Sequence, residues 1–209
     1  MGSVTITLPD NSTKEYSSGI SSYEIANEIG TRLAQDSIAV KVNYELHDIY
    51  SNITEDSILE FVTINSEEGH EILLHSTAHL MAQAVKDLFP KAKVTIGPAI
   101  ENRFYYDFDV EVPFTEKDLE MIEDKMREMA SQKQEVIRLE MTRDEAIDMF
   151  KKMDEPYKVE IISEIDPKDK ISLYSQNSFI DLCRGPHVPN TGMIKHFQLL
   201  ESSSAYWRG

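Results

Sequence analysis

The first third of the chain alternates between apolar and polar positions, and this alternation predicts β-strands. Residues 4–8 and 13–16 are two such stretches, and the Pro, Asp, Asn and Ser between them are typical of a turn. Apolar stretches over residues 38–42 and 58–64 indicate further strands, and a helix with serine at its start runs up to Gly30. Two strands, a helix and further strands within about 64 residues predict a small β-grasp module.

A polar, turn-rich segment at residues 65–69 separates this module from a longer helical pattern. Residues 70–88 carry apolar side chains at helical spacing, and Phe89 and Pro90 end the helix. We therefore expect a second domain over residues 70–209, joined to the first module by this linker.

Capping signals and strand patterns continue through the second domain. Thr115 with Asp118 and Thr142 with Glu145 have the spacing of capping boxes, so a helix is expected after each threonine. Apolar and aromatic stretches predict strands at residues 104–108, 136–139, 171–174, 179–183 and 197–201. Strands and helices that do not alternate regularly indicate an α+β domain with a mostly antiparallel sheet.

Composition changes this picture in three ways. The net charge of −16 counts against broad nucleic-acid binding, because phosphate contacts need lysine and arginine. No apolar run is long enough for a membrane span, and no signal peptide is evident at the N-terminus. The single cysteine excludes an intrachain disulfide and fits the reducing cytoplasm.

Two dyads are the most informative chemical feature of the chain. His75 and His79 are four residues apart in a predicted helix, so both imidazoles lie on one face. Cys183 and His187 are also four apart, and the Gly-Pro pair between them predicts a tight bend that turns the second side chain toward the first. One helical histidine or one buried cysteine is more often structural, but the dyads together favour a shared site. Three imidazoles and a thiol predict either a metal site or a pocket that activates water.

Five short strings of the chain are distinctive: residues 75–80 (HSTAHL), 95–101 (TIGPAIE), 104–108 (FYYDF), 181–189 (DLCRGPHVP) and 205–209 (AYWRG). Together they resemble the N-terminal region of bacterial threonyl-tRNA synthetases. The resemblance covers essentially the whole chain, with residues 1–64 similar to the TGS module of that family and residues 70–209 similar to its editing domain. The related alanyl-tRNA editing domains share the two dyads, whereas the string at residues 181–189 is more specific.

The resemblance implies an editing reaction, the hydrolysis of serine from seryl-tRNA for threonine. It implies the acceptor end of that tRNA as partner, and a threonine–tRNA ligase acting as a homodimer as the parent enzyme. No string resembles the signatures for ATP binding and amino-acid activation, so we expect a fragment without the catalytic core and the anticodon-binding domain. Arg103 stands where the family usually has glycine, which either alters the backbone there or adds a cation near the pocket.

The proton-transfer roles follow from this reaction. Hydrolysis of an aminoacyl ester needs an oriented water, a proton relay and stabilisation of the oxyanion. His75, His79 and His187 can position water and move protons, because imidazole titrates near neutral pH. Cys183 could be a ligand, a pocket wall or a proton relay, and it is less suited to be a covalent nucleophile because so activated an ester yields to water.

The remaining candidates would bind the substrate or balance charge. Asp181 precedes the cysteine by two residues on a predicted strand, so it faces the same side and could bind the α-ammonium or hydroxyl group. Lys158 matches a lysine that the family uses in its pocket, where it could stabilise negative charge. Tyr105 or Tyr106 is expected to stack on the terminal adenosine, and Arg184 is expected to contact the substrate.

Zinc is the open alternative at the dyads. His75, His79, Cys183 and His187 satisfy tetrahedral coordination on paper, and the alanyl relatives use an equivalent set in that way. The threonyl editing domains are taken to work without zinc, so the resemblance implies no tightly bound cofactor. Two other function classes stay open: a noncatalytic RNA- or nucleotide-binding regulatory module, and a structural zinc-binding domain that chelators would unfold.

Overall fold

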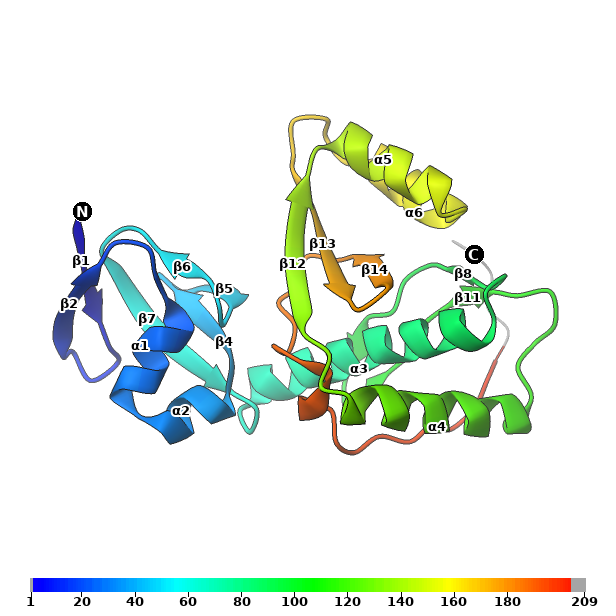
Figure 1. Cartoon of the computed structure of the whole chain (residues 1–209), viewed down its shortest axis with the longest axis horizontal. Coiled ribbons are helices and arrows are strands. Elements are labelled where there is room, and N and C mark those ends of the chain that lie inside the picture. The colour runs from blue at the N-terminus through cyan, green and yellow to red at the C-terminus, as the bar shows by residue number, and fades with distance from the viewer. Residues whose placement is uncertain (1, 204–209) are drawn as a thin grey trace. The chain divides into compact units, whose positions relative to one another are not determined.

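The structure is a computed structural model that describes residues 2–203 of the 209-residue chain. In chain order (Figure 1), its elements are β1 (Ser3–Thr7), β2 (Thr13–Ser17), β3 (Ile20–Ser21), α1 (Ser22–Ile29), α2 (Thr31–Asp36), β4 (Ser37–Val42), β5 (Glu45–Asp48), β6 (Asn52–Ile53), β7 (Ser57–Thr63), α3 (Glu67–Leu88), β8 (Lys93–Val94), β9 (Ala99–Ile100), β10 (Arg103–Phe104), β11 (Phe108–Asp109), α4 (Glu116–Ser131), β12 (Val136–Met141), α5 (Arg143–Lys152), α6 (Pro156–Ser163), β13 (Ile171–Gln176), β14 (Phe179–Leu182) and the 3₁₀ helix η1 (Thr191–Met193). Contacts group the chain into two compact units, one of residues 1–73 with the short turn 185–189, the other of residues 74–184 with 190–209. None of the described helices is long and apolar enough to cross a membrane.

The first unit is built on a five-stranded sheet. Its strand order is β2-β1-β7-β4-β5, in which β1 and β7 run parallel and the other neighbours run antiparallel. Helix α1 packs its apolar face on the sheet, and the shared core consists of Val4, Ile6, Ile25, Val40, Ile49, Ile53 and Leu59. This mixed sheet with one packed helix confirms the β-grasp prediction.

Local signals determine the first elements of this unit. The alternating stretches fold as the predicted hairpin, and Val4 and Ile6 of β1 are buried while their strand neighbours are not. Ser21 caps α1 as expected, and its hydroxyl and the Glu24 carboxylate form a complete capping box. The helix ends at Gly30, as the sequence predicts.

Four elements of the first unit, α2, β3, β5 and β6, are absent from the sequence prediction. Strands β3 and β6 have two residues each, too few for an alternating pattern. Helix α2 has six residues and no side-chain hydrogen bond at its N-cap, so it carries no capping signal. Strand β5 pairs with β4 across Asn43 and Tyr44, which both have positive φ. Such a turn usually contains glycine, and its absence hides the hairpin from a reading of the sequence.

The second unit contains an antiparallel sheet of order β12-β13-β14, with α5 and α6 packed on it. Its core joins the two helices to strand β13 through Ala146, Phe150, Ile162, Ile171 and Leu173. Two short antiparallel pairs, β8 with β11 and β9 with β10, complete its strands among the described residues. The predicted α+β class is therefore confirmed. Both threonine capping boxes form as predicted, at the N-termini of α4 and α5.

Helix α3 begins at Glu67, three residues earlier than the sequence pattern predicts. The Ser66 hydroxyl accepts a hydrogen bond from the Gly69 N–H, and Glu67 and Glu68 occupy the first turn. Both features stabilise a helix N-terminus, since they satisfy a free N–H group and oppose the positive end of the helix dipole. Most of the polar segment at residues 65–69 is therefore helical.

Two expectations for the second unit differ from the structure, and β8, β9, α6 and η1 have no counterpart in the prediction. The aromatic strand at residues 104–108 is paired only at its two ends, because the chain turns inward at Tyr106 between β10 and β11. Residues 197–201 form no strand, since side chains of α4 hold this segment: Arg127 lies over the Phe197 ring and Glu123 accepts from the Leu199 N–H. Helix α6, which starts with proline at its first turn, was not predicted. The string at residues 205–209 lies outside the described residues.

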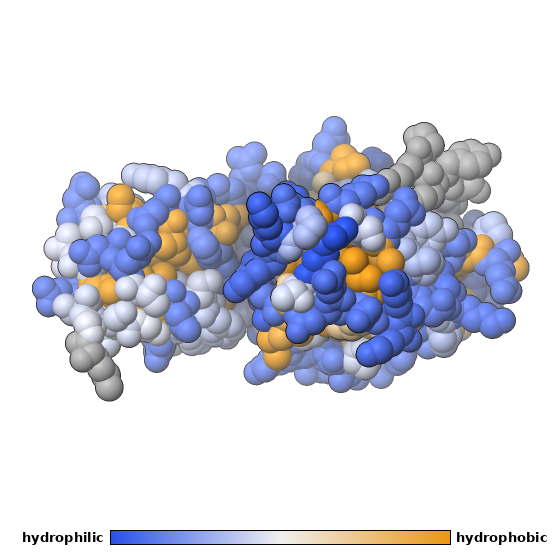
Figure 2. Space-filling model, turned by 90° about the horizontal axis from the view of Figure 1, so that it is seen from above, coloured by the Kyte–Doolittle hydropathy of each residue, from blue (hydrophilic) through white to orange (hydrophobic). Residues whose placement is uncertain are grey.

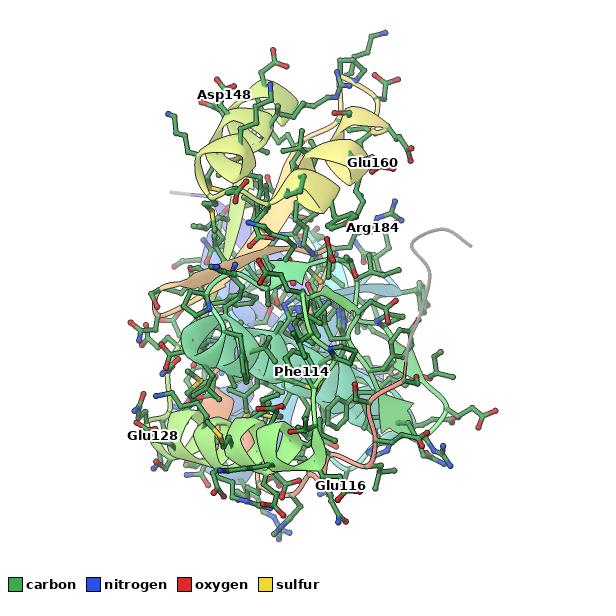
Figure 3. All side chains as sticks on the ribbon, turned by 90° about the vertical axis from the view of Figure 1, so that its right-hand side faces the viewer. Phe114, Glu116, Glu128, Asp148, Glu160 and Arg184 are labelled. Carbon is green, nitrogen blue, oxygen red and sulfur yellow. The ribbon has the colours of Figure 1, made fainter. Side chains whose placement is uncertain are left out.

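Hydrophilic side chains cover most of the surface visible in Figure 2. Helix α4 turns acidic side chains such as Glu116 and Glu128 outward (Figure 3). Exposed carboxylates of this kind contribute to the net charge of −16.

Candidate active site

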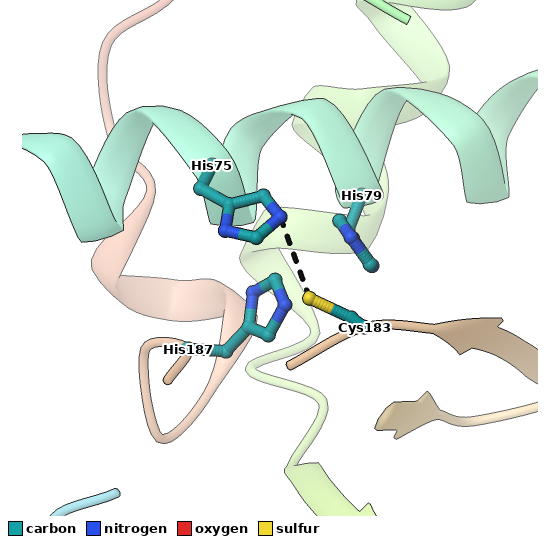
Figure 4. Close-up of side chains that lie close together, drawn as sticks. All are labelled: His75, His79, Cys183 and His187. Atoms are coloured by element: carbon teal, nitrogen blue, oxygen red, sulfur yellow. Dashed lines mark hydrogen bonds between the residues drawn. The ribbon is translucent and has the colours of Figure 1, made fainter. Parts of the chain in front are cut away.

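The two dyads meet although they are far apart in the sequence. Helix α3 holds His75 and His79 one turn apart, with ring centroids 5.0 Å from each other. Cys183 follows β14, and strand β13 fixes its backbone: its N–H donates to the Ser172 carbonyl at 3.3 Å and its carbonyl accepts from the Ser172 hydroxyl at 2.7 Å. The Cys183 Sγ then lies 3.4 Å from the His75 Nε2 (Figure 4).

The bend after Cys183 has the tight geometry that its Gly-Pro pair predicts. Gly185 has a φ of 73°, a left-handed conformation that suits glycine, and the Gly185–Pro186 peptide bond is cis. His187 follows and is buried. The ligand atoms of both dyads all lie within 4.8 Å of one another (Figure 4).

A buried ion pair lies beside the dyads. The Lys158 Nζ from α6 is 2.5 Å from the Asp181 Oδ1 on β14, and both side chains are almost fully buried. The Tyr106 hydroxyl bridges the pair, because it donates to the Asp181 Oδ2 at 2.6 Å and accepts from the Lys158 Nζ at 2.9 Å. The same Asp181 Oδ2 is 3.6 Å from the His79 Nδ1, so this network reaches the first dyad. Buried charges are tolerated when they are paired and hydrogen-bonded, and here both are.

Burial determines the protonation of the groups around the ion pair. Burial lowers the pKa of His75, although the Asp181 charge opposes this. Burial lowers the pKa of His79 well below its usual value, and His75 and Lys158 lower it further. Both imidazoles are therefore neutral at pH 7, and protonation of His79 is the more strongly disfavoured. Burial and the Asp181 carboxylate raise the pKa of Tyr106, so its hydroxyl stays protonated and can donate.

The two tyrosines of the predicted substrate site have different surroundings. Tyr106 is buried, and its ring stacks on Phe108 with centroids 5.0 Å apart. Tyr105, next in the chain, is 36% exposed. A base can stack only on an open ring face, so Tyr105 is the better placed of the two.

The two arginines of interest are exposed. The Arg184 side chain lies at the surface (Figure 3), and its carbonyl accepts a hydrogen bond from Arg138. Arg103 pairs with Ile100 in the β9–β10 hairpin and has no positive φ. The arginine at this position therefore adds a cation without a left-handed backbone.

Comparisons with known proteins add to this geometry. A family model described as the TGS domain matches residues 4–63, and one described as the threonyl and alanyl tRNA synthetase second additional domain matches residues 171–206. The chain is 52% identical to a threonine–tRNA ligase of Geobacter sp. (strain M21) over 209 residues, all of this chain and 33% of that protein. It is 51% identical to a threonine–tRNA ligase of Coxiella burnetii over 205 residues, 98% of this chain and 32% of that protein.

The chain fits the N-terminal region of a threonyl-tRNA synthetase. It spans about a third of the length of the threonine–tRNA ligases it matches. Its candidate site combines residues from the editing-domain match with a histidine pair that precedes that match, on α3.

The two dyads could hold a metal by their chemistry. Zinc bonds of about 2.0–2.3 Å in a tetrahedron place ligand atoms roughly 3.3–3.8 Å apart. The four ligand atoms here lie within 4.8 Å of one another, so His75, His79, Cys183 and His187 would hold zinc after small side-chain movements. A bound zinc supplies Lewis acidity, but four protein ligands leave no open position for water.

Two site residues have no counterpart in the sequence prediction. The Gln176 side chain donates to the His79 carbonyl at 3.2 Å and to the Gln83 Oε1 at 2.9 Å, which ties β13 to α3 directly behind the first dyad. A polar residue at an inward position of an apolar strand is the signal that marks Gln176. The second such residue is Gly97, whose role no sequence pattern indicates and the structure reveals through its close contact with the Tyr106 ring.

Proposed function

We propose that this chain edits mischarged tRNA by hydrolysing the ester that joins serine to the tRNA for threonine. The observation that carries the proposal is the convergence of the two dyads beside the buried Lys158–Asp181 pair, in a chain whose sequence matches an editing-domain family. A pocket with neutral imidazoles and a fixed charge pair has the groups that ester hydrolysis needs.

The chemical need for such a site is clear. Serine lacks one methyl group of threonine, and a missing methyl changes binding by only about 1–3 kcal/mol. A charging site therefore accepts serine at a measurable rate. A second site that hydrolyses the smaller product completes a double sieve.

The dyads provide the proton chemistry in this proposal. His75 is neutral at pH 7 and is the better proton acceptor of the two, because Asp181 opposes the lowering of its pKa. His79 positions the water, since burial, His75 and Lys158 lower its pKa well below the usual value and so disfavour its charged form. His187, whose ring lies in the same cluster, orients the water, and Cys183, 3.4 Å from His75, relays a proton or forms the pocket wall. Hydrolysis by water needs no covalent intermediate on the thiol.

Lys158, Asp181, Tyr105 and Arg184 act on the substrate in this proposal. Asp181 provides the negative charge for the α-ammonium group, and Lys158 balances it and faces the developing oxyanion. The exposed Tyr105 ring stacks on the terminal adenosine, and the exposed Arg184 contacts the tRNA backbone.

Steric exclusion is the proposed basis of selectivity. Serine and threonine carry the same hydroxyl and ammonium groups, so polar contacts cannot separate them. The extra methyl would overfill a packed wall, and overpacking costs about 1–3 kcal/mol. The wall is expected in the neighbourhood of the two dyads.

The wider context of the chain is part of the same proposal. Residues 1–64 form the TGS module, 65–69 the linker and 70–209 the editing domain. The chain acts in the cytoplasm within a homodimeric threonine–tRNA ligase, and the site works without tightly bound zinc.

A deacylation assay with the purified chain tests this function. Seryl-tRNA for threonine should be hydrolysed well above the buffer rate, and threonyl-tRNA should not. His75→Ala should lower the rate by about 10²–10⁴-fold, the usual contribution of a general base. The matched control is His70→Ala, an exposed histidine on the same helix, which should leave the rate unchanged. A chain that only binds tRNA would show the buffer rate with both substrates, and that result rejects the proposal.

A further inference from the structure

Gly97 occupies a place in the second unit where no side chain fits. A Cβ added there would lie 2.1 Å from the Tyr106 Cδ2 and 2.8 Å from the Tyr105 carbonyl oxygen. Gly97 is not among the residues with positive φ, so this requirement comes from packing and not from backbone conformation. The bare backbone of Gly97 is therefore the surface on which the Tyr106 ring lies.

Hydrogen bonds hold this surface in place. Thr95 donates to the Asp107 carbonyl through its N–H at 3.1 Å and through its hydroxyl at 2.7 Å. The Asp107 N–H donates in turn to the Ile96 carbonyl at 2.9 Å. These bonds hold the segment 95–97, which contains Gly97, against the segment 105–107, which carries the ring. With Phe108 stacked on it, Tyr106 has little room to move.

The position of the ring decides where the hydroxyl lies. That hydroxyl contacts Lys158 and Asp181, which come from the separate elements α6 and β14. A lysine ammonium is a compact charge on a flexible four-carbon chain, so an ion pair alone leaves its position poorly defined. A third group that bonds to both partners selects one arrangement.

We propose that Gly97 and Tyr106 are positioning residues of the hydrolytic site: Gly97 seats the Tyr106 ring, and the Tyr106 hydroxyl fixes Lys158 and Asp181 beside His79. This inference rests on the proposed editing function and deepens it. It gives Tyr106 a role inside the protein, and it leaves contact with the terminal adenosine to Tyr105. It also explains why a glycine is needed at position 97, outside both dyads.

Single substitutions measure the effect on turnover. Tyr106→Phe keeps the ring and removes only the hydroxyl, and Gly97→Ala displaces the ring. Both should lower kcat for seryl-tRNA by roughly 10–100-fold, because a displacement of about 1 Å at a reacting site costs on the order of 10²-fold. KM for the tRNA should stay within about threefold, since neither residue touches it. Gly30→Ala is the matched control, because Gly30 has nothing within 4 Å of an added Cβ and its φ of 178° suits any residue.

A double-mutant cycle separates positioning from a general packing defect. Once Tyr106→Ala has removed the ring, Gly97→Ala should lower kcat by no more than about threefold further. This small further decrease in kcat would come from the close contact of the added Cβ with the Tyr105 carbonyl oxygen, which remains when the ring is absent. Effects that multiply across the two positions would overturn the proposal, as would wild-type kcat in Tyr106→Phe.

A measurement without tRNA keeps the inference distinct from the editing function. Lys158 is 2% exposed in its side chain, so reductive methylation followed by peptide mass spectrometry should label it slowly, with the exposed Lys117 as internal standard. Tyr106→Phe and Gly97→Ala should each raise Lys158 labelling at least tenfold relative to Lys117, and Gly30→Ala should not. Unchanged labelling in Tyr106→Phe, the variant of equal shape, overturns the positioning role. If the wild-type chain does not hydrolyse seryl-tRNA but labelling responds as stated, the editing function is rejected. The positioning of the Tyr106 ring by Gly97, and of Lys158 and Asp181 by the Tyr106 hydroxyl, is then still supported.

Discussion

The two regions of the chain bury different kinds of polar side chain. Among the described residues up to 73, the buried polar side chains are three serines, and each hydroxyl donates to a nearby backbone carbonyl: Ser22, Ser37 and Ser57. Beyond residue 73, the buried set includes a lysine, two acids and histidines: Lys158, Asp181, Glu155, His79 and His187. A buried hydroxyl is satisfied by a single backbone carbonyl, whereas a buried charge needs an opposite charge and further hydrogen bonds.

This difference indicates where the chain gives up stability for chemistry. The core of the first region is an apolar cluster that any well-packed small domain needs. The second region has such a cluster too, between α5, α6 and β13, but it also encloses an ion pair and two neutral imidazoles. Replacing a buried ion pair by apolar residues of similar size is often neutral or stabilising, so the pair is poorly explained by stability alone.

Breaking the ion pair should have the largest effect. Lys158→Met leaves the Asp181 carboxylate buried without its cation, and such a change usually costs about 3–5 kcal/mol. The free energy of unfolding, measured with urea, should fall by that amount, and hydrolysis of seryl-tRNA should be lost. Lys41→Met is the control in the first region, where the lysine pairs with Glu60 and Glu68 at the surface, and it should cost far less.

A second variant shows whether the pair serves chemistry. Lys158→Met combined with Asp181→Leu removes both charges, so stability should recover most of the loss while hydrolysis stays absent. If the double variant hydrolyses seryl-tRNA at the wild-type rate, the pair is structural and the comparison of the two regions loses its meaning.

A core substitution in the first region should give the next largest effect, and on stability alone. Leu59 is fully buried in the apolar cluster, so Leu59→Ala should cost about 2–5 kcal/mol of unfolding free energy. In conditions where the variant is folded, kcat for seryl-tRNA should match the wild type. A parallel loss of kcat would show that the TGS module and the editing domain do not act independently, against the proposed domain organisation.

The sequence predicts the elements whose signals are local. The hairpin of β1 and β2, the serine N-cap of α1 and the capping boxes at Thr115 and Thr142 each depend on a few neighbouring residues, and all are confirmed. Helix α6 and strand β5 were missed for the opposite reason. Helix α6 has no capping side chain, and the β5 turn uses Asn43 and Tyr44 in place of glycine.

The residues of the site also differ in whether a local sequence pattern predicts them. The spacing of the dyads predicts that four side chains can converge, and the structure brings them together. The place of Lys158 came from the family resemblance, because a lysine in an amphipathic segment looks like a surface residue until α6 packs. Gly97 and Gln176 act through tertiary contacts with residues far along the chain, and no local pattern contains that information. The roles of all these residues in catalysis stay predictions.

Acid should have a smaller effect, and it should fall on the second region. The pKa of His79 is well below its usual value of 6.5 in the folded chain, and that of His75 is also lowered, so the unfolded chain binds more protons below pH 6.5. Unfolding free energy therefore decreases as pH falls from 7 toward 5.5, by at most about 1.4 kcal/mol per pH unit for each histidine. Urea titrations of wild type and His79→Gln at both pH values test this, because other titrating groups are common to the two proteins. The variant should lose less unfolding free energy on acidification than the wild type. An equal loss would show that protonation of His79 does not cause the decrease.

Chelation should have the smallest effect, and it separates the two uses of the dyads most directly. If the imidazoles work as neutral proton acceptors, dialysis against EDTA should change neither the melting temperature nor the rate on seryl-tRNA. Added zinc should inhibit, because His75, His79, Cys183 and His187 would close on it as four ligands and leave no position for water. A structural zinc site gives the reverse: chelation would lower the melting temperature, and zinc would restore it, since metal binding at such a site contributes directly to folding. Loss of hydrolysis on chelation with an unchanged melting temperature would instead indicate a catalytic metal held by the two dyads, beside the buried Lys158–Asp181 pair.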